Sequence, residues 1–235
     1  NMERIAQQGG NKQKQIRLSS FDEDIIAHVK QSLALDEVDV LHPSLMNQVF
    51  RPFWRREASF DLVESCTSFE VLPPLDPGLP ADGLPDDYIA VKFYGNNSFP
   101  ESDENRAFVL DTLRRLTEHS DVVLLDTGFR IDDHEQFGNE RRDRLHTINR
   151  LVVPSNNLEV QTRISSRARA FVGTYGGFSY LAPLQGVSSL AFYSHPDKFL
   201  PHHLELANRV FSRMGGSFVA LDVADVGLVR LGLES

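Results

Sequence analysis

The chain has 235 residues, 41% of them hydrophobic, and a formal net charge of −9 at neutral pH. This acidic balance argues against a general nucleic-acid-binding surface, and the single cysteine, Cys66, excludes an internal disulfide framework. We find no signal peptide and no apolar run near the roughly 18–20 residues that span a bilayer, so we expect a cytoplasmic protein without a membrane span.

The first 71 residues predict a flexible start followed by part of an α/β domain. Residues 1–14 begin with Asn1 and Met2, which resemble a tag remnant, and continue as if at the tail of a helix. We therefore interpret the chain as a fragment of a longer protein. Residues 15–71 carry a partial β-α-β unit, with strands predicted at 15–18 and 39–41 and helices at 22–33 and 45–50.

A proline- and glycine-rich stretch, LPPLDPGLPADGLP, begins at Leu72. Proline lacks a backbone N–H and fixes φ, so this stretch can form neither a helix nor a central strand. We therefore place a linker at residues 72–86 and a second domain at residues 87–235.

Strands and helices alternate throughout residues 87–235. Strands are predicted at 88–93, 122–126, 145–148, 170–172, 189–193 and 218–223. Helices are predicted from a Ser102 cap to about 119 and at 158–168, 178–184, 203–214 and 224–233, and a polar loop at 127–139. Apolar runs such as VVLL and SLAF indicate strands buried on both faces. The predicted fold class is α/β: a doubly wound, Rossmann-like parallel sheet, preceded by the partial β-α-β unit of a second domain.

The stretch GTYGGFSYLAPLQG, which begins at Gly173, contains the best candidate for a ligand site. A buried strand runs into a turn of small residues and then into a short helix. Such a turn leaves backbone N–H groups pointing at one place, where the positive end of the helix dipole favours a phosphate. Hydroxyl groups in and beside the turn, on Thr174, Tyr175 and Ser179, could add hydrogen bonds. The alternative is that the glycines only permit a tight packing turn.

Other candidates follow the carboxyl ends of the predicted strands, where ligands bind in open parallel sheets. Lys92 lies late in an apolar strand and faces either solvent or an anion at the carboxyl end of that strand, with Tyr94 and Asn96 as hydrogen-bonding companions. In the polar loop, Asp133 and His134 are candidates for catalysis or for hydrogen bonds to a sugar or base.

The sequence lacks the motifs that mark several common classes of enzyme. There is no nucleophile elbow, phosphate-binding Walker motif or zinc-type cysteine set, and the dinucleotide spacing G-x-G-x-x-G is absent. No second His/Asp cluster stands at metal-ligand spacing. We therefore expect neither a metal nor a cofactor, and hydride transfer with NAD is disfavoured.

Residues 87–228 resemble the C-terminal, nucleotide-sugar-binding domain of GT-B-fold glycosyltransferases, especially heptosyltransferase- and fucosyltransferase-like members. The resemblance rests on the strand with Lys92, the turn Asp126-Thr127-Gly128 and the segment GTYGGFSYLAPLQGVSSLAFYS. It implies a donor diphosphate site that includes Gly128 and Lys92 with its companions. It also implies that the following residues bind that diphosphate: Gly173, Thr174, Tyr175, Gly176, Gly177, Phe178 and Ser179.

The resemblance also implies a function. A nucleotide-diphosphate sugar would bind at the carboxyl ends of the parallel strands. Its sugar would then be transferred, without a metal, to a glycan or small-molecule acceptor held by the other domain. Residues 15–71 resemble only the last part of such an acceptor domain. Two alternatives stay open: a sugar-nucleotide epimerase-like enzyme and a non-catalytic nucleotide-sugar-binding module.

Overall fold

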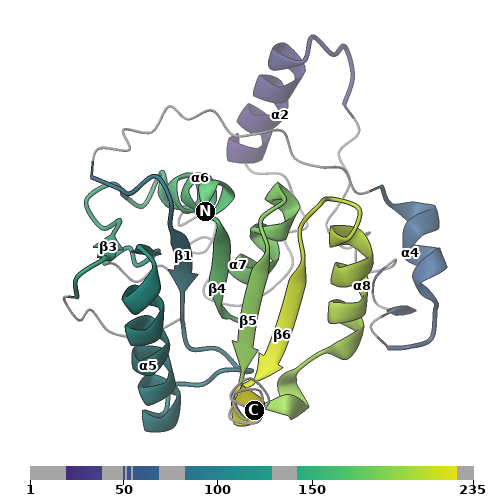
Figure 1. Ribbon diagram of the computed structural model, residues 1–235. Helices are drawn as coiled ribbons and strands as arrows, with labels where there is room; N and C mark the ends of the chain where they lie inside the picture. Colours follow the sequence, from purple (N-terminus) through teal and green to yellow (C-terminus); the bar gives the residue numbers. More distant parts are fainter. Residues whose placement is uncertain are drawn as a thin grey trace. The chain divides into compact units, whose positions relative to one another are not determined.

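The computed structural model of the chain describes residues 20–38, 50, 52–53, 55–68, 83–128 and 142–226 (Figure 1). The chain divides into two compact units, residues 1–68 and 69–235. The boundaries predicted at 14, 71 and 86 stay predictions. The strands expected at 15–18 and 39–41 lie outside the described residues, as does the helix expected at 45–50 apart from Phe50.

In the first unit, two helices have described bounds, and Phe50, Pro52 and Phe53 are also helical. Helix α2 (Ser20–Ser32) confirms the helix expected at 22–33, and its acidic first turn and basic last turn complement the helix dipole. Helix α4 (Phe60–Cys66) was not expected from the sequence. It is short and buries only Phe60 and Val63, so it carries little of the apolar periodicity that marks longer helices.

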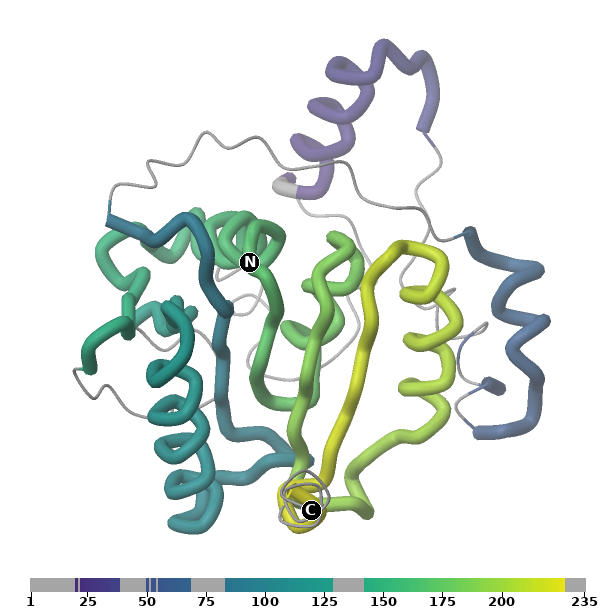
Figure 2. The backbone as a smooth tube through the Cα atoms, viewed as in Figure 1, coloured from purple at the N-terminus to yellow at the C-terminus, as the bar shows by residue number. Residues whose placement is uncertain are grey.

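The second unit is built on a six-stranded, all-parallel sheet with the strand order β3-β2-β1-β4-β5-β6. The strands are β1 (Ile89–Lys92), β2 (Val122–Leu124), β3 (Leu145–Thr147), β4 (Ala170–Thr174), β5 (Ser189–Tyr193) and β6 (Phe218–Asp222). This confirms the predicted class, a Rossmann-like parallel sheet. Chain order along the sheet reverses between β1 and β4, which lie side by side in Figure 2.

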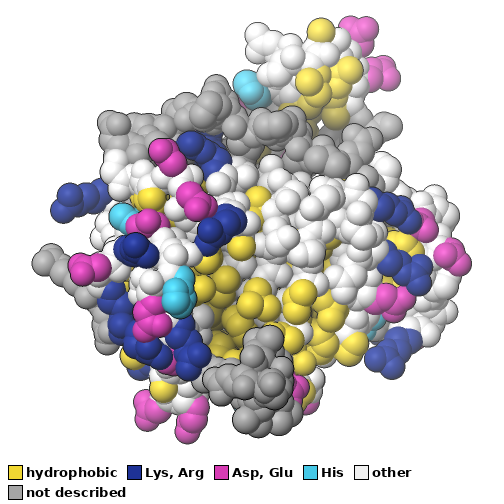
Figure 3. Space-filling view, viewed as in Figure 1, with side chains coloured by type: hydrophobic (Ala, Val, Ile, Leu, Met, Phe, Trp, Pro, Cys, Tyr) yellow, Lys and Arg dark blue, Asp and Glu magenta, His cyan; other side chains and the backbone are white. Residues whose placement is uncertain are grey.

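Helices cover both faces of this sheet, because alternate residues of each strand point to opposite sides. Helix α5 (Asp103–His119) packs Val109 and Leu113 against Val91 on one face. The other face carries α6 (Asn157–Arg167), α7 (Gly177–Leu181) and α8 (Pro201–Phe211). Figure 3 shows hydrophobic side chains gathered over the middle of the sheet beside α5. On β6, Val219 pairs with Leu190 of β5 and is 47% exposed.

Local boundaries differ from the prediction where proline and glycine intervene. Strand β4 continues two residues past Val172, so Gly173 belongs to the strand and not to the turn. The helix expected at 178–184 is divided into α7 and a 3-10 turn, Pro183–Gln185, because proline cannot donate a helical hydrogen bond. Gly186, with φ 77°, ends this segment as expected.

The end of the chain is described only in part. A 3-10 turn, Val223–Asp225, occupies the start of the helix expected at 224–233, and residues 227–235 lie outside the described part. Of the loop expected at 127–139, the structure describes Thr127 and Gly128. None of the described helices combines the length and apolar character that a bilayer span requires.

Candidate functional site

The point where strand order reverses lies between the carboxyl ends of β1 and β4. The chain leaves β1 toward α5 on one face, and leaves β4 toward α7 on the other. In open α/β sheets this divergence forms the crevice in which ligands bind. The fold therefore brings the predicted segments around Lys92 and Gly176 together, although the two segments come from distant parts of the sequence.

Lys92 is the last residue of β1 and stands opposite Gly173 of β4. Its half-buried side chain lies on the face that carries α6 and α7. The Nζ atom donates to the Oε1 atom of Gln161 and, at 3.4 Å, to the carbonyl of Leu125. It also lies 4.0 Å from the centre of the Phe178 ring, a cation–π contact. The ammonium group is thus fixed between the end of β2, α6 and α7.

Gln161 was not predicted from the sequence as a site residue. Its side chain is fully buried on the inner face of α6, and its Nε2 atom donates to the carbonyl of Asn157, 3.3 Å away. The available signal was an amide on the buried stripe of a helix, next to Val160. A buried amide of this kind needs hydrogen-bond partners, and one of its partners is the predicted lysine.

The two glycines of the turn play different parts. A Cβ atom on Gly176 would lie 2.2 Å from the Tyr94 hydroxyl oxygen, so a side chain at this position would force the buried Tyr94 ring to move. A Cβ atom on Gly177 would meet nothing within 4 Å. Space is therefore open beside Gly177, at the start of α7.

Backbone N–H groups of the turn are only partly used by the protein. The N–H of Gly176 donates to Ser179 Oγ at 3.1 Å, and Ser179 Oγ donates to the Gly176 carbonyl at 2.7 Å. Among the residues that the structure describes, the N–H groups of Gly177 and Phe178 have no hydrogen-bond acceptor. Two donors at the start of α7 are therefore not used by the described part of the chain.

Several predicted ligand groups hold the two loops to each other. The buried Thr174 hydroxyl bonds to both the N–H and the carbonyl of Tyr94, at 3.0 and 2.9 Å. Asn96 donates to the Tyr175 carbonyl at 3.0 Å and accepts from the N–H of Phe99 at 2.8 Å. These bonds are internal, as in the packing interpretation of the turn. A ligand role for these side chains stays a prediction.

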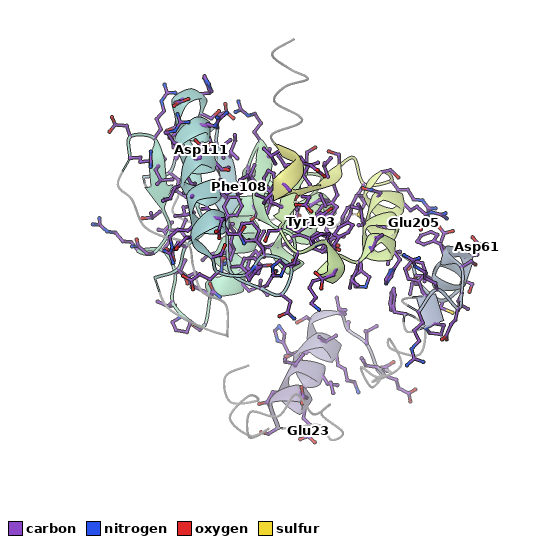
Figure 4. All side chains as sticks on the ribbon, turned by 90° about the horizontal axis from the view of Figure 1, so that it is seen from below. Glu23, Asp61, Phe108, Asp111, Tyr193 and Glu205 are labelled. Carbon is purple, nitrogen blue, oxygen red and sulfur yellow. The ribbon has the colours of Figure 1, made fainter. Side chains whose placement is uncertain are left out.

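The Tyr175 side chain lies away from the open space. Its hydroxyl accepts a hydrogen bond from Tyr180, 2.8 Å away, and burial raises the pKa of both phenols. The ring packs against Phe199 and Tyr193, which is labelled in Figure 4. Tyr175 is thus part of the aromatic core under α8.

The remaining candidates lie at or beyond the end of β2. Gly128, with φ 71°, donates its N–H to Asp126 Oδ1 at 2.9 Å in a side-chain-closed turn. This turn follows Leu125, whose carbonyl contacts Lys92. The proposed catalytic candidates Asp133 and His134 lie outside the described residues.

Within the described ranges, no group of three or more His, Cys, Asp or Glu side chains could hold a metal ion. Comparisons of the chain with protein-family models, curated proteins and solved structures found no match. What the arrangement offers chemically is a fixed cation, Lys92, and two N–H donors at the start of α7 that no described residue accepts from. These groups suit a phosphate or diphosphate.

Proposed function

We propose that residues 69–235 bind a nucleotide-diphosphate sugar at the carboxyl ends of β1 and β4. We further propose that the chain belongs to a glycosyltransferase of GT-B type, which passes the sugar to an acceptor. The observation that carries this proposal is the reversal of strand order between β1 and β4, with Lys92 on one strand and, after the other, N–H donors that no described residue accepts from.

The chemistry follows from charge. Cleavage of the bond between the sugar and the diphosphate leaves additional negative charge on the leaving phosphate oxygens. The ammonium of Lys92 and the N–H groups of Gly177 and Phe178 would stabilise that charge as it develops, without reorganising. In this proposal the chain holds the leaving group electrostatically and needs no metal ion for that purpose.

Thermal unfolding of the full chain with UDP-, GDP-, ADP- and dTDP-sugars tests the binding step. We expect one nucleotide class to raise the unfolding temperature selectively, because ligands that bind only the folded state stabilise it. Stabilisation by none of them would contradict the proposal. With the selected donor, release of nucleoside diphosphate indicates transfer, a changed sugar still linked to its nucleotide indicates an epimerase, and an unchanged donor indicates a binding module.

The turn itself is tested by Gly177→Asp, with Gly177→Asn as a control of the same size. Both side chains would enter open space, so both variants should fold. Only aspartate adds negative charge beside the diphosphate. We expect Gly177→Asp to weaken nucleotide-sugar binding by about tenfold or more relative to Gly177→Asn, measured by titration calorimetry. Equal affinities would remove Gly177 from the site.

A further inference from the structure

We infer that Gln161 is the residue that positions Lys92 for the diphosphate, an inference that rests on the proposed function. A continuous chain of hydrogen bonds runs from the Lys92 ammonium through the Gln161 side chain to Asn157 in the first turn of α6. Gln161 would not touch the ligand. It acts by holding the Lys92 ammonium group at the carboxyl end of β1.

The orientation of the Gln161 amide is determined by its neighbours. The Asn157 carbonyl can only accept a hydrogen bond, so the amide nitrogen must face it. The Oε1 atom then faces Lys92, whose ammonium can only donate. Because Gln161 is fully buried, its amide cannot exchange either partner for water without moving α6.

A neutral acceptor is well suited to this task. Glutamine fixes the direction of the ammonium group while leaving its positive charge uncancelled by that bond. The ring of Phe178 limits movement from another side, at 4.0 Å from Nζ. Glutamate at position 161 would supply similar geometry but pair its own charge with Lys92. The attraction between Lys92 and a bound diphosphate would then be reduced.

The test compares UDP, GDP and ADP binding by calorimetry to the full chain. The variants are Gln161→Glu, Gln161→Met, Lys92→Met and the two double variants with Lys92→Met. We expect Gln161→Glu to weaken binding by about tenfold and Gln161→Met by a smaller factor. In the Lys92→Met background either change should alter affinity by less than about twofold, because the effect acts through the lysine.

A pH series separates this role from a purely structural one. As the pH falls, the new carboxyl group of the Gln161→Glu variant gains a proton. The affinity of this variant for the nucleotide should then approach that of the wild type at the same pH. If Gln161→Glu does not fold, Gln161→Met and its double variant carry the comparison. Gln161 variants with wild-type affinity, or equally weakened with and without Lys92, would overturn the inference. A wild-type chain that binds none of the three nucleotides would instead overturn the proposed function.

Discussion

Tyr88 shows how burial changes the chemistry of one side chain in this sheet. Its hydroxyl donates to the Ile164 carbonyl on α6 at 2.8 Å, and the residue is 5% exposed. Burial raises the pKa of Tyr88 to about 12, because the charged phenolate would lose its hydration. This hydrogen bond connects Tyr88, the residue before β1, to α6, the helix that also carries Gln161.

This raised pKa predicts a loss of stability at alkaline pH. Above about pH 10 the tyrosine of the unfolded chain loses its proton, whereas the folded one keeps it until about pH 12, so the stabilisation present below pH 10 disappears across this window. The loss amounts to about 2–3 kcal/mol. We expect the free energy of unfolding of Tyr88→Phe, measured in urea, to fall less steeply with pH than that of the wild type. Parallel pH profiles would contradict the assignment.

At the residue scale, residue type alone could not show which polar side chains are used inside the protein. Lys92 was singled out because a lysine stands out in an apolar strand, and its ligand role stays a prediction. Thr174 and Asn96 offered equally plausible ligand groups, yet both bond to backbone groups of the opposite loop. The sequence shows only the residue type, and that type is the same whether the hydroxyl or amide bonds to a ligand or to the protein. The partner depends on where the side chain is buried in the folded chain.

At the scale of elements, helix α5 combines a local N-terminal cap with contacts to residues that are distant in the sequence. Ser102 accepts a hydrogen bond from the N–H of Asn105 at 3.1 Å, which confirms the predicted cap. Asn105 is buried and donates to Ser194, beyond the end of β5. Further along the helix, Phe108 (Figure 4) packs its ring edge-on against Phe192, with centroids 4.9 Å apart. The cap thus lies near the carboxyl ends of the strands, where the candidate site is located.

Removal of this cap should cost a measurable amount of stability. Ser102→Ala leaves the Asn105 N–H without its acceptor, so we expect the free energy of unfolding to fall by about 1 kcal/mol. Ser102→Asp keeps an acceptor and should retain most of the wild-type value. Urea unfolding gives both values. An alanine variant as stable as the aspartate variant would show that the hydrogen bond contributes nothing.

At the scale of the whole molecule, the main hydrophobic clusters among the described residues lie within one unit. The three clusters that the structure describes draw their residues from Leu84 to Val226, within the unit 69–235. The six strands belong to that unit as well. A unit that contains its own sheet and core has what a domain needs to fold alone.

We therefore expect a chain that begins at residue 69 to fold cooperatively. Circular dichroism and urea unfolding should show a single transition, and nucleotide-sugar affinity should match that of the full chain within about threefold, because the proposed site lies in this unit. Transfer to an acceptor is not expected from this shortened chain. A shortened chain that aggregates or lacks a cooperative transition would show that residues 1–68 are needed for folding.

The local pattern of the sequence determined the kind and order of the elements. Apolar runs and helical spacing predicted every strand of the sheet, and β5 was placed at the residues observed. Serine and glycine signals placed the start of α5 and the left-handed turn at Gly186. These features depend on neighbours within a few residues, so a single sequence carries them.

Only the tertiary structure decided which strands are neighbours and what each polar group contacts. The pairing of β1 with β4 brings Tyr94 and Thr174 together across 80 residues of sequence and places Lys92 against Gln161. It also distinguishes Gly176, where a side chain would displace the Tyr94 ring, from Gly177, which borders open space. Contacts between distant segments follow from the packing of the whole sheet, because no local periodicity records which strand will lie beside another.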